Sequence, residues 1–393
     1  MGSRLRASQI EVTRSSVDQR QCAPRAMSTA RACAAPLAPP MRPTRERYRV
    51  RARASAGEND ARVICVVGGT GRIGAMVVER LLTQPARPTR VRVLARDDRS
   101  ARAERLKALG AEVTRGDVVS EADVQSWVSS ARCDACVAVF GAQRIGKITD
   151  VFAAAPETRE DDFGHPYWVN FRAVRTLAEV CERAGCEKFI RVTGMSVGYP
   201  AFDWIAVLLN VVLSMTIQWQ LAGEQALRAI CAASSTMKYV VVRPGSLSDA
   251  APCAEDVAGQ RRLVLGCGDA RVHAGKVART DVADVIIEAL NRADVQNATL
   301  SVAGSATPSG GVRTELVWDP ARGMHWKTVE QDDNVREGVD YKESAMWTTV
   351  TSDVSELREK NHRRYVAMFL ALLVGLGVLF IRAFVGVMTK VFL

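Results

Sequence analysis

The chain has 393 residues, of which 48% are hydrophobic, and a formal net charge of +10. This length accommodates one large domain with extensions. Residues 1–57 hold 12 arginines and three acidic residues, contributing +12 − 3 = +9, so the rest of the chain carries about +10 − 9 = +1. A nucleic-acid partner is therefore not expected, because such partners require a basic folded surface. The ten cysteines follow no regular framework, which is typical of free thiols in a reducing compartment.

Residues 1–57 are predicted to be an organellar transit peptide. They are rich in Arg, Ser, Ala and Pro, poor in acidic residues, and lack the apolar run of a secretory signal. Serine and proline favour a chloroplast, whereas the density of arginine keeps a mitochondrion as the alternative. A disordered basic tail is the other interpretation.

The most informative stretch runs from Arg62 to Leu82. An apolar strand ends in glycines at positions 68, 71 and 74, and an apolar-periodic helix follows. This spacing lets the backbone turn tightly and hold a pyrophosphate at the helix N-terminus. We predict a dinucleotide-binding loop, the alternative being a glycine-rich structural turn. The predicted cofactor contacts of the loop are Gly68, Thr70, Gly71, Arg72, Ile73 and Gly74.

A second predicted strand, 90–96, indicates which dinucleotide is bound. It ends at Arg96, 96 − 74 = 22 residues after the last glycine. A basic residue at this point favours the 2′-phosphate of NADP, and an acidic residue favours the ribose hydroxyls of NAD. Arg96, with Arg72 as a second cation, predicts NADP. NAD is the alternative, if Asp97 binds the ribose.

The next strand, 112–117, follows a helix over 100–109 with Ser100 as its N-cap. Its last residue, Asp117, is expected either to accept a hydrogen bond from the adenine amino group or to cap the helix from Ser120. A fourth strand, 135–140, then ends at Gly141. The C-x-x-C pair Cys133 and Cys136 starts this strand and does not open a helix, so we expect structural cysteines and not a redox pair.

The remaining elements continue the alternation of strands and helices. A segment that we expect to be a loop over the pocket, 143–166, precedes a helix over 166–184, strands over 187–193 and 238–243, a helix over 280–290 and a strand over 298–302. This order predicts an α/β fold with a doubly wound parallel sheet. Ligands of such sheets bind at the carboxyl ends of the strands, which here are 68–74, 96, 117, 141–142, 193–196 and 243–245.

Several motifs together resemble one family. They are V-V-G-G-T-G-R-I-G, the strand-two Arg96, G-D-V, F-I-R-V-T-G-M-S, V-V-R-P-G and A-R-T-D-V-A-D-V. The combination resembles the atypical short-chain dehydrogenase/reductases, and within them the NmrA-like NAD(P)H-binding group of plastids and cyanobacteria, over about residues 61–304. The resemblance implies a Rossmann fold with NADP, or NAD, held at Gly68, Gly71, Gly74, Arg96 and Asp117 and at the strand ends that include Gly141 and Thr193.

The sequence departs from the family at the catalytic helix. Active short-chain reductases use Tyr-x-x-x-Lys, in which the tyrosine transfers a proton and the lysine lowers its pKa. Aligned on the Glu-x-x-Leu/Arg ending, Gln218 takes the tyrosine place and Ala222 the lysine place, and residues 200–237 contain neither Tyr nor Lys. Ser196 is a weak catalytic candidate that could polarise a carbonyl, or it caps the turn after strand five. Tyr199, which precedes Pro200 in a turn, is expected to have a packing role and not a catalytic one.

Two apolar stretches lie in the second half of the chain. The run 204–217 is short for a membrane span and is expected to line the core or pocket, with an interfacial segment as the alternative. After a polar connecting segment, 305–364, residues 365–390 are predicted to form a transmembrane helix, with Arg382 near its distal end. Cations before the helix predict that the soluble domain faces the stroma or matrix. The alternative is a helix buried in a complex.

These observations predict four parts: a transit peptide (1–57), an NAD(P)-binding Rossmann domain (58–304), the connecting segment and the membrane helix. The partners are a nicotinamide dinucleotide, a membrane and, through the anchor, a membrane protein complex. One functional hypothesis is an oxidoreductase that lacks the Tyr-x-x-x-Lys pair. The other is a non-catalytic NADPH-sensing assembly or scaffold factor at an organellar membrane.

Overall fold

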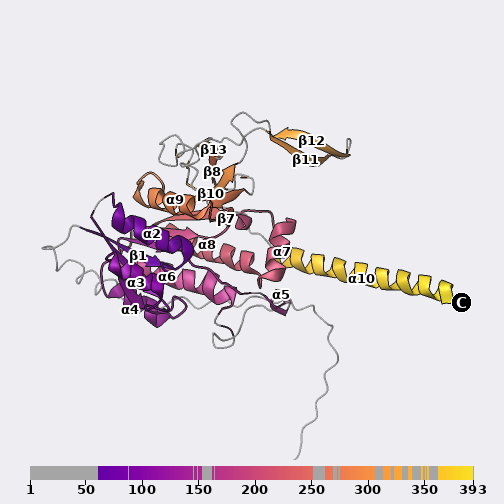
Figure 1. The fold of residues 1–393 in the computed structure, drawn as a ribbon, viewed down its shortest axis with the longest axis horizontal. Helices are drawn as coiled ribbons and strands as arrows, with labels where there is room; N and C mark the ends of the chain where they lie inside the picture. The colour runs from indigo at the N-terminus through magenta and orange to yellow at the C-terminus, as the bar shows by residue number, and fades with distance from the viewer. Residues whose placement is uncertain are drawn as a thin grey trace, which may run out of the picture. The chain divides into compact units, whose positions relative to one another are not determined.

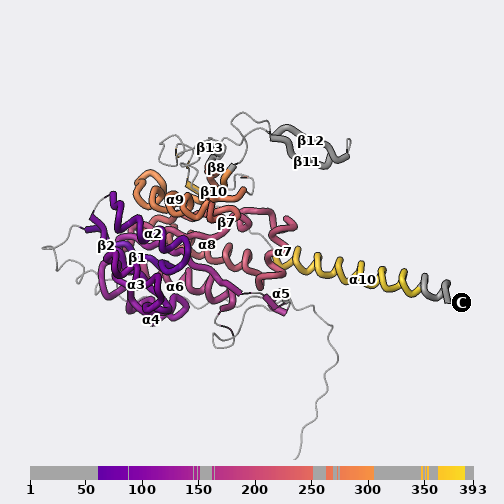
Figure 2. The backbone as a smooth tube through the Cα atoms, viewed as in Figure 1, coloured from indigo at the N-terminus to yellow at the C-terminus, as the bar shows by residue number. Residues whose placement is uncertain are grey.

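The computed structural model describes residues 61–86, 88–144, 146–147, 149–152, 162, 164–250, 262–268, 272, 275–305, 313–319, 323–329, 335–338, 347, 350, 352–353 and 362–392. The predicted transit peptide lies outside these residues. Figure 2 traces the backbone through the alternating strands and helices from β1 to α9.

A nine-stranded sheet, in the order β13-β8-β10-β6-β5-β4-β1-β2-β3, forms the centre of the domain. Its seven strands from β10 to β3 are parallel, and β8 and β13 add an antiparallel extension beyond β10. The parallel part is the predicted doubly wound sheet, with the strand order reversing between β1 and β4. The strands are β1 Arg62–Val67, β2 Thr89–Ala95, β3 Glu112–Arg115, β4 Ala135–Ala138, β5 Lys188–Val192, β6 Lys238–Pro244, β8 Arg262–Cys267, β10 Ala298–Ser305 and β13 Val335–Gly338.

Helices cover both faces of this sheet (Figure 1). One apolar cluster joins the sheet to α2, α3 and α9 through side chains such as Val77, Leu106 and Val285. A second cluster joins the opposite face to α4, α6 and α8 through Val124, Leu177 and Leu227. These helices are α2 Arg72–Thr83, α3 Ala101–Ala108, α9 Arg279–Asn291, α4 Glu121–Ser129, α6 Ala173–Arg183 and α8 Thr216–Ala233.

Most predicted elements are present, with local differences. Ser100 caps α3 as expected, because its hydroxyl accepts a hydrogen bond from the Ala103 amide. The helix predicted over 166–184 begins as a π-helix, Tyr167–Arg172, before α6. Elements that the sequence pattern did not predict are α5 Thr149–Phe152, the 3₁₀-helix Met195–Val197, the paired β7 Ser246–Ser248 and β9 Lys276–Ala278, and the hairpin of β11 Arg313–Asp319 and β12 Gly323–Val329.

The apolar run 204–217 is broken into two helices and is not one core segment. Its first part is α7, Trp204–Val212, and α8 starts at Thr216 after a bend of 99°. Ser214 and Met215 make the bend in left-handed conformations, with φ of 52° and 59°. The buried Asn210 side chain then accepts hydrogen bonds from two amides at the start of α8.

The C-terminal helix α10 runs from His362 to Phe392 and begins three residues before the predicted boundary. Its segment His362–Val385 is long and apolar enough to cross a membrane. Within the predicted connecting segment, Ser352 and Asp353 have no helical structure.

Candidate cofactor site

The glycine loop between β1 and α2 is shaped for close approach of a ligand backbone. Gly68 has φ +83°, a conformation that side-chain-bearing residues rarely adopt, and a Cβ there would lie 2.2 Å from the Val139 carbonyl oxygen. A Cβ on Gly74 would lie 2.1 Å from the Gly68 carbonyl oxygen, so the helix packs directly on the loop. The Gly71 amide donates to that carbonyl at 2.9 Å and Gly71 is the N-cap of α2. The amides of the first helical turn are then available to a phosphate.

The side chains around this loop divide into buried and exposed sets. Ile73 is buried against the sheet and fixes the helix, whereas Arg72 is exposed at the first helical position. Thr70 is half-buried, and its carbonyl oxygen accepts a hydrogen bond from Arg102 Nη1 at 3.2 Å. Arg72 and Arg102 line a groove of about 460 Å³ along α2. A cationic rim therefore borders the phosphate-binding backbone.

Arg96 follows β2 and is also exposed. Among the described residues neither Arg96 nor Arg72 forms an ion pair, so both guanidinium groups are available for an anion. The Asp97 carboxylate accepts a hydrogen bond from the Arg99 amide at 2.9 Å, which holds it in a local turn. This arrangement places cations where a 2′-phosphate is bound in such folds.

Asp117 and Gly141 follow the next two strands. Asp117 Oδ1 accepts from the Val119 amide at 3.0 Å, and Ser120, not Asp117, caps α4. Of the two roles considered for Asp117, the helix cap is therefore wrong. Gly141 is exposed, and the neighbouring Ala142 amide donates to Asn170 Oδ1 at 3.0 Å.

Asn170 is a site residue that the sequence analysis missed. It is fully buried in the π-helix, and its Nδ2 donates to Thr216 Oγ1 at 3.0 Å. Its side chain thus joins the loop after β4 to the first residue of α8. A Cβ on Gly223 would lie 2.1 Å from the Asn170 carbonyl oxygen, so α8 packs against the π-helix at a glycine. π-helical turns are frequent at functional sites. In the sequence, the only indication of Asn170 was a single amide residue beside the apolar face of the predicted helix.

The helix that carries Tyr-x-x-x-Lys in active relatives presents amides here. Gln218 and Gln220 on α8 each have a buried Oε1 with no hydrogen-bond partner among the described residues. Ser196 makes no side-chain hydrogen bond with any described residue and does not cap the 3₁₀-helix after β5. A Cβ on Gly194 would lie 3.8 Å from both Gln220 Oε1 and Ser196 Oγ. Polar atoms with unused hydrogen-bonding capacity therefore flank the end of β5.

Thr193 directly follows β5, and its hydroxyl group bonds to a buried side chain of the protein. It donates to Glu224 Oε1 at 2.7 Å. Glu224 is fully buried and pairs with Arg243 at 2.6 Å and with Arg228 at 3.1 Å. Burial raises the pKa of Glu224, but the two guanidinium groups outweigh it and lower the pKa to about 2.

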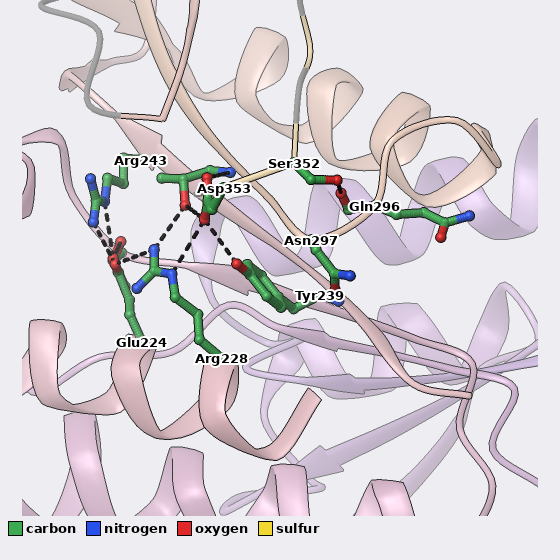
Figure 3. A network of polar contacts seen from close by, with 10 residues as sticks. Glu224, Arg228, Tyr239, Arg243, Gln296, Asn297, Ser352 and Asp353 are labelled. Atoms are coloured by element: carbon green, nitrogen blue, oxygen red, sulfur yellow. Dashed lines mark hydrogen bonds and ion pairs between the residues drawn. The ribbon is translucent and has the colours of Figure 1, made fainter. Parts of the chain in front are cut away.

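The same network continues to the C-terminal segment (Figure 3). Asp353 accepts hydrogen bonds from the Thr299 amide and hydroxyl, at 3.0 and 2.6 Å, and from the Tyr239 hydroxyl at 2.9 Å. Arg228 Nε also reaches it at 3.3 Å. The network joins α8, β6 and β10 to a residue outside the predicted Rossmann boundaries, which the sequence analysis had placed in the connecting segment without a role.

The sheet order, the glycine loop and the strand-end residues define a dinucleotide-binding Rossmann protein. The loop fits the cofactor because Gly68 and Gly74 let α2 pack directly on the loop, and the amides of the first turn of α2 are available to a phosphate. A family model described as NAD(P)H-binding matches residues 68–293. This match covers more than half of the chain, which therefore belongs to that NAD(P)H-binding family.

The similar solved structures have low sequence identity to this chain. ChuY, an anaerobillin reductase from Escherichia coli O157:H7, is 20% identical, with 61% of this chain and 96% of that chain covered at a TM-score of 0.43. A short-chain dehydrogenase/reductase from Veillonella parvula in complex with NADP is 15% identical (63% and 99% covered, TM-score 0.43). WbmG from Bordetella bronchiseptica in complex with NAD is 16% identical (64% and 76% covered, TM-score 0.40). Similarity at this level does not bear on the substrate.

Proposed function

We propose that the chain is a membrane-anchored NADP(H)-binding oxidoreductase that works without the Tyr-x-x-x-Lys pair. The observation that carries the proposal is the glycine loop at the start of α2, bordered by Arg72 and Arg96, neither of which pairs with an acidic residue in the described part of the chain. The loop supports dinucleotide binding, and the arginines support NADP over NAD, because a guanidinium recognises a phosphate through paired hydrogen bonds.

The chemistry follows from the groups at the end of β5. The nicotinamide would supply or accept a hydride, as it does in the fold family. The Ser196 hydroxyl can donate a hydrogen bond to a substrate carbonyl, and the Oε1 atoms of Gln218 and Gln220 can accept one from a substrate hydroxyl. None of these side chains titrates near neutral pH, so the proton must come from water or from the substrate.

The second candidate is a non-catalytic NADPH-sensing assembly or scaffold factor. The composition of α8 favours it, because Gln218 and Ala222 occupy the places of the catalytic tyrosine and lysine. The buried Glu224 network also fixes α8 rigidly against β6. Such a protein would use the cofactor as a ligand that stabilises one conformation.

One experiment separates the two candidates. The full mature chain in detergent is tested for NADPH binding by fluorescence and for NADPH oxidation against a panel of quinones and carbonyls. The oxidoreductase predicts turnover that falls in Ser196→Ala and is unchanged in the matched variant Ser130→Ala. Tight binding without turnover across the panel would overturn it in favour of the sensor.

Membrane attachment is proposed from α10 and from its neighbour α7. The start of α10 packs on the domain, where Val366 is buried with Val207 and Trp219. Tyr365 also contacts Phe202 at 5.9 Å between ring centroids. Beyond this contact the apolar side chains of α10 between 371 and 385 are exposed, and Trp204 of the adjoining α7 is 71% exposed. A bilayer crossed by α10 would cover the exposed face of α7 as well, in the manner of an interfacial helix.

This attachment is tested by carbonate extraction and vesicle binding. Full-length chain is expected to resist extraction. Trp204→Glu is expected to loosen the domain from anionic vesicles, measured as faster proteolysis at the α7 face. The exposed control Ala108→Glu is expected to have no such effect. A chain that is extracted by carbonate would contradict the anchor.

The compartment is proposed to be the chloroplast, with the soluble domain facing the stroma and a mitochondrial membrane as the alternative. Its support is the composition of residues 1–57 and the cations before α10. Fusing residues 1–57 to a fluorescent protein tests it: chloroplast import supports the proposal, and mitochondrial import overturns it.

A further inference from the structure

A cluster of buried thiols lies apart from the cofactor site. The Sγ atoms of Cys133, Cys181 and Cys186 lie within 4.8 Å of one another, and all three residues are buried. Cys133 and Cys186 precede β4 and β5, whereas the glycine loop follows β1. Because the strands are parallel, the thiols lie at the amino edge of the sheet, opposite the cofactor edge.

Two more thiols and one cation extend this cluster. Cys65 on β1 and Cys136 on β4 are buried in the same apolar cluster as these three cysteines. Cys65 and Cys136 are register neighbours on β1 and β4. Arg92 Nη1 lies 3.8 Å from Cys65 Sγ, and its Nη2 bonds to the Trp127 carbonyl at 2.6 Å. Five of the seven cysteines of the described residues therefore gather in one part of the core.

We propose that Cys133, Cys181 and Cys186 bind one soft d¹⁰ metal ion, Cu⁺ or Zn²⁺, through their thiolates. A metal–sulfur distance of about 2.3 Å places three thiolates roughly 3.8–4.0 Å apart, so the cluster needs to close by less than about 1 Å. The three potential ligands are all sulfur, which selects Cu⁺ or Zn²⁺ over Mg²⁺, Ca²⁺ or Mn²⁺.

The surroundings suit a closed structural site. Three thiolates on a monovalent or divalent ion leave a net negative charge, which is costly in an interior unless it is compensated. Arg92 Nη1, 3.8 Å from Cys65 Sγ, supplies a nearby positive charge. Three thiolates complete a trigonal site for Cu⁺. Structural Zn²⁺ sites have four protein ligands, so Zn²⁺ would take its fourth thiolate from Cys65 or Cys136 in the same buried cluster.

An isolated core cysteine acts as a small hydrophobic residue, and Cys267 provides that comparison. It is buried on the opposite face of the sheet, in the cluster with α2 and α9. The cluster cysteines differ because a loop, the helix α6 and a second loop bring their sulfurs to one point. All seven described cysteines are free thiols, so no disulfide competes for these ligands.

The test uses the full chain, purified in detergent with a reductant that does not bind metal. Cu⁺ is titrated against a chromophoric chelator and Zn²⁺ against a fluorescent one. We expect one ion per chain, with X-ray absorption showing sulfur neighbours at about 2.3 Å. Cys181→Ser should weaken binding by at least about 100-fold, because losing even an outer-shell partner of a metal ligand costs about 10–100-fold. Cys267→Ser should leave the binding unchanged.

The two titrations decide between the ions, and tighter binding of either one at this site supports the proposal. Binding that is equal in Cys181→Ser and wild type, or an absorption spectrum dominated by nitrogen and oxygen neighbours, would overturn it. The spectrum requires no variant, so a folding defect in Cys181→Ser does not affect that result. NADPH binding is measured on the same samples and should not change, since the thiols and the glycine loop lie at opposite edges of the sheet.

Discussion

The two halves of the parallel sheet differ in the groups that lie at their ends and in the exposure of those groups. Around β1 and α2 the functional groups are backbone amides and exposed arginines, and the side chains of the glycine loop are small. Around β5, β6 and α8 the end of the sheet is filled by a buried charged network centred on Glu224. The first half has an exposed polar edge that is available to a ligand, whereas the charged side chains of the second half pair with one another in the interior.

This difference separates binding from catalysis. The glycine loop needs only a few small residues and a helix N-terminus. Its binding of a dinucleotide therefore does not depend on the side chains of α8. Proton transfer by the protein itself would need a titratable side chain at the tyrosine position of α8. Gln218 occupies that position, so the proton must come from water or from the substrate. The comparison predicts that changes in the β6–α8 half will alter stability, and that changes in the β1–α2 half will alter ligand binding.

The largest expected effect is on stability. Glu224→Ala leaves Arg243 and Arg228 without their shared carboxylate in the protein interior, and removing one partner of a buried ion pair costs about 3–5 kcal/mol. Denaturant unfolding should show this loss, while the exposed control Glu187→Ala should change the free energy of unfolding by less than about 0.5 kcal/mol. A loss below about 1 kcal/mol would mean that the network is not what holds α8 on the sheet.

The same carboxylate predicts a dependence of stability on pH. Its folded pKa of about 2 lies below its ordinary value of 4.5, so its contribution is complete above about pH 4.5. That contribution, of about 3 kcal/mol, is lost as the pH falls from about 4.5 to 2. Unfolding measured across this window should be less pH-dependent in Glu224→Gln than in wild type. Identical slopes would show that other carboxylates account for the acid sensitivity.

The next effect belongs to the glycine loop. Gly71→Asp places a carboxylate beside the expected pyrophosphate, and we expect NADPH affinity to fall by at least about 100-fold, or roughly 2.7 kcal/mol. Ala108→Asp adds the same charge at an exposed position of α3 and should bind normally. Fluorescence titration checks both, and normal binding by Gly71→Asp would show that the dinucleotide is held elsewhere.

The smallest expected effect is on the choice of dinucleotide. Arg96→Glu replaces a phosphate-binding cation by a carboxylate that favours ribose hydroxyls. The ratio of NADPH to NADH affinity should fall by about 10-fold, and Arg132→Glu, at a cation that follows α4, should leave it unchanged. An unaltered ratio in Arg96→Glu would assign the phosphate to Arg72 and Arg102 instead.

Local sequence signals were sufficient for the cofactor half. The glycine spacing, the strand-end arginine and the apolar periodicity of each helix are all encoded within a few residues, and the parallel sheet follows from their order. Asn170 and Asp353 could not be found in this way. Each acts through partners that lie 46 or more residues away in the chain, Thr216 and Thr299, and only the folded structure brings them together.

The division of the apolar run 204–217 into two helices could not be predicted for a related reason. Hydrophobicity alone predicts burial, but Ser214 and Met215 turn the backbone left-handed and send α7 away from α8. Composition cannot show such a bend, because neither residue is typical of the left-handed region.

The position of Asp353 limits how far the domain can move from the C-terminal helix α10. Nine residue steps separate it from His362, where α10 begins (362 − 353 = 9), and a fully extended chain covers at most about 32 Å over nine steps. If α10 spans a bilayer, as we propose, this segment keeps Asp353 within that distance of the start of the membrane helix. For a reactant dissolved in the lipid, that confinement acts as a raised effective concentration, which a freely diffusing copy of the same domain would not have.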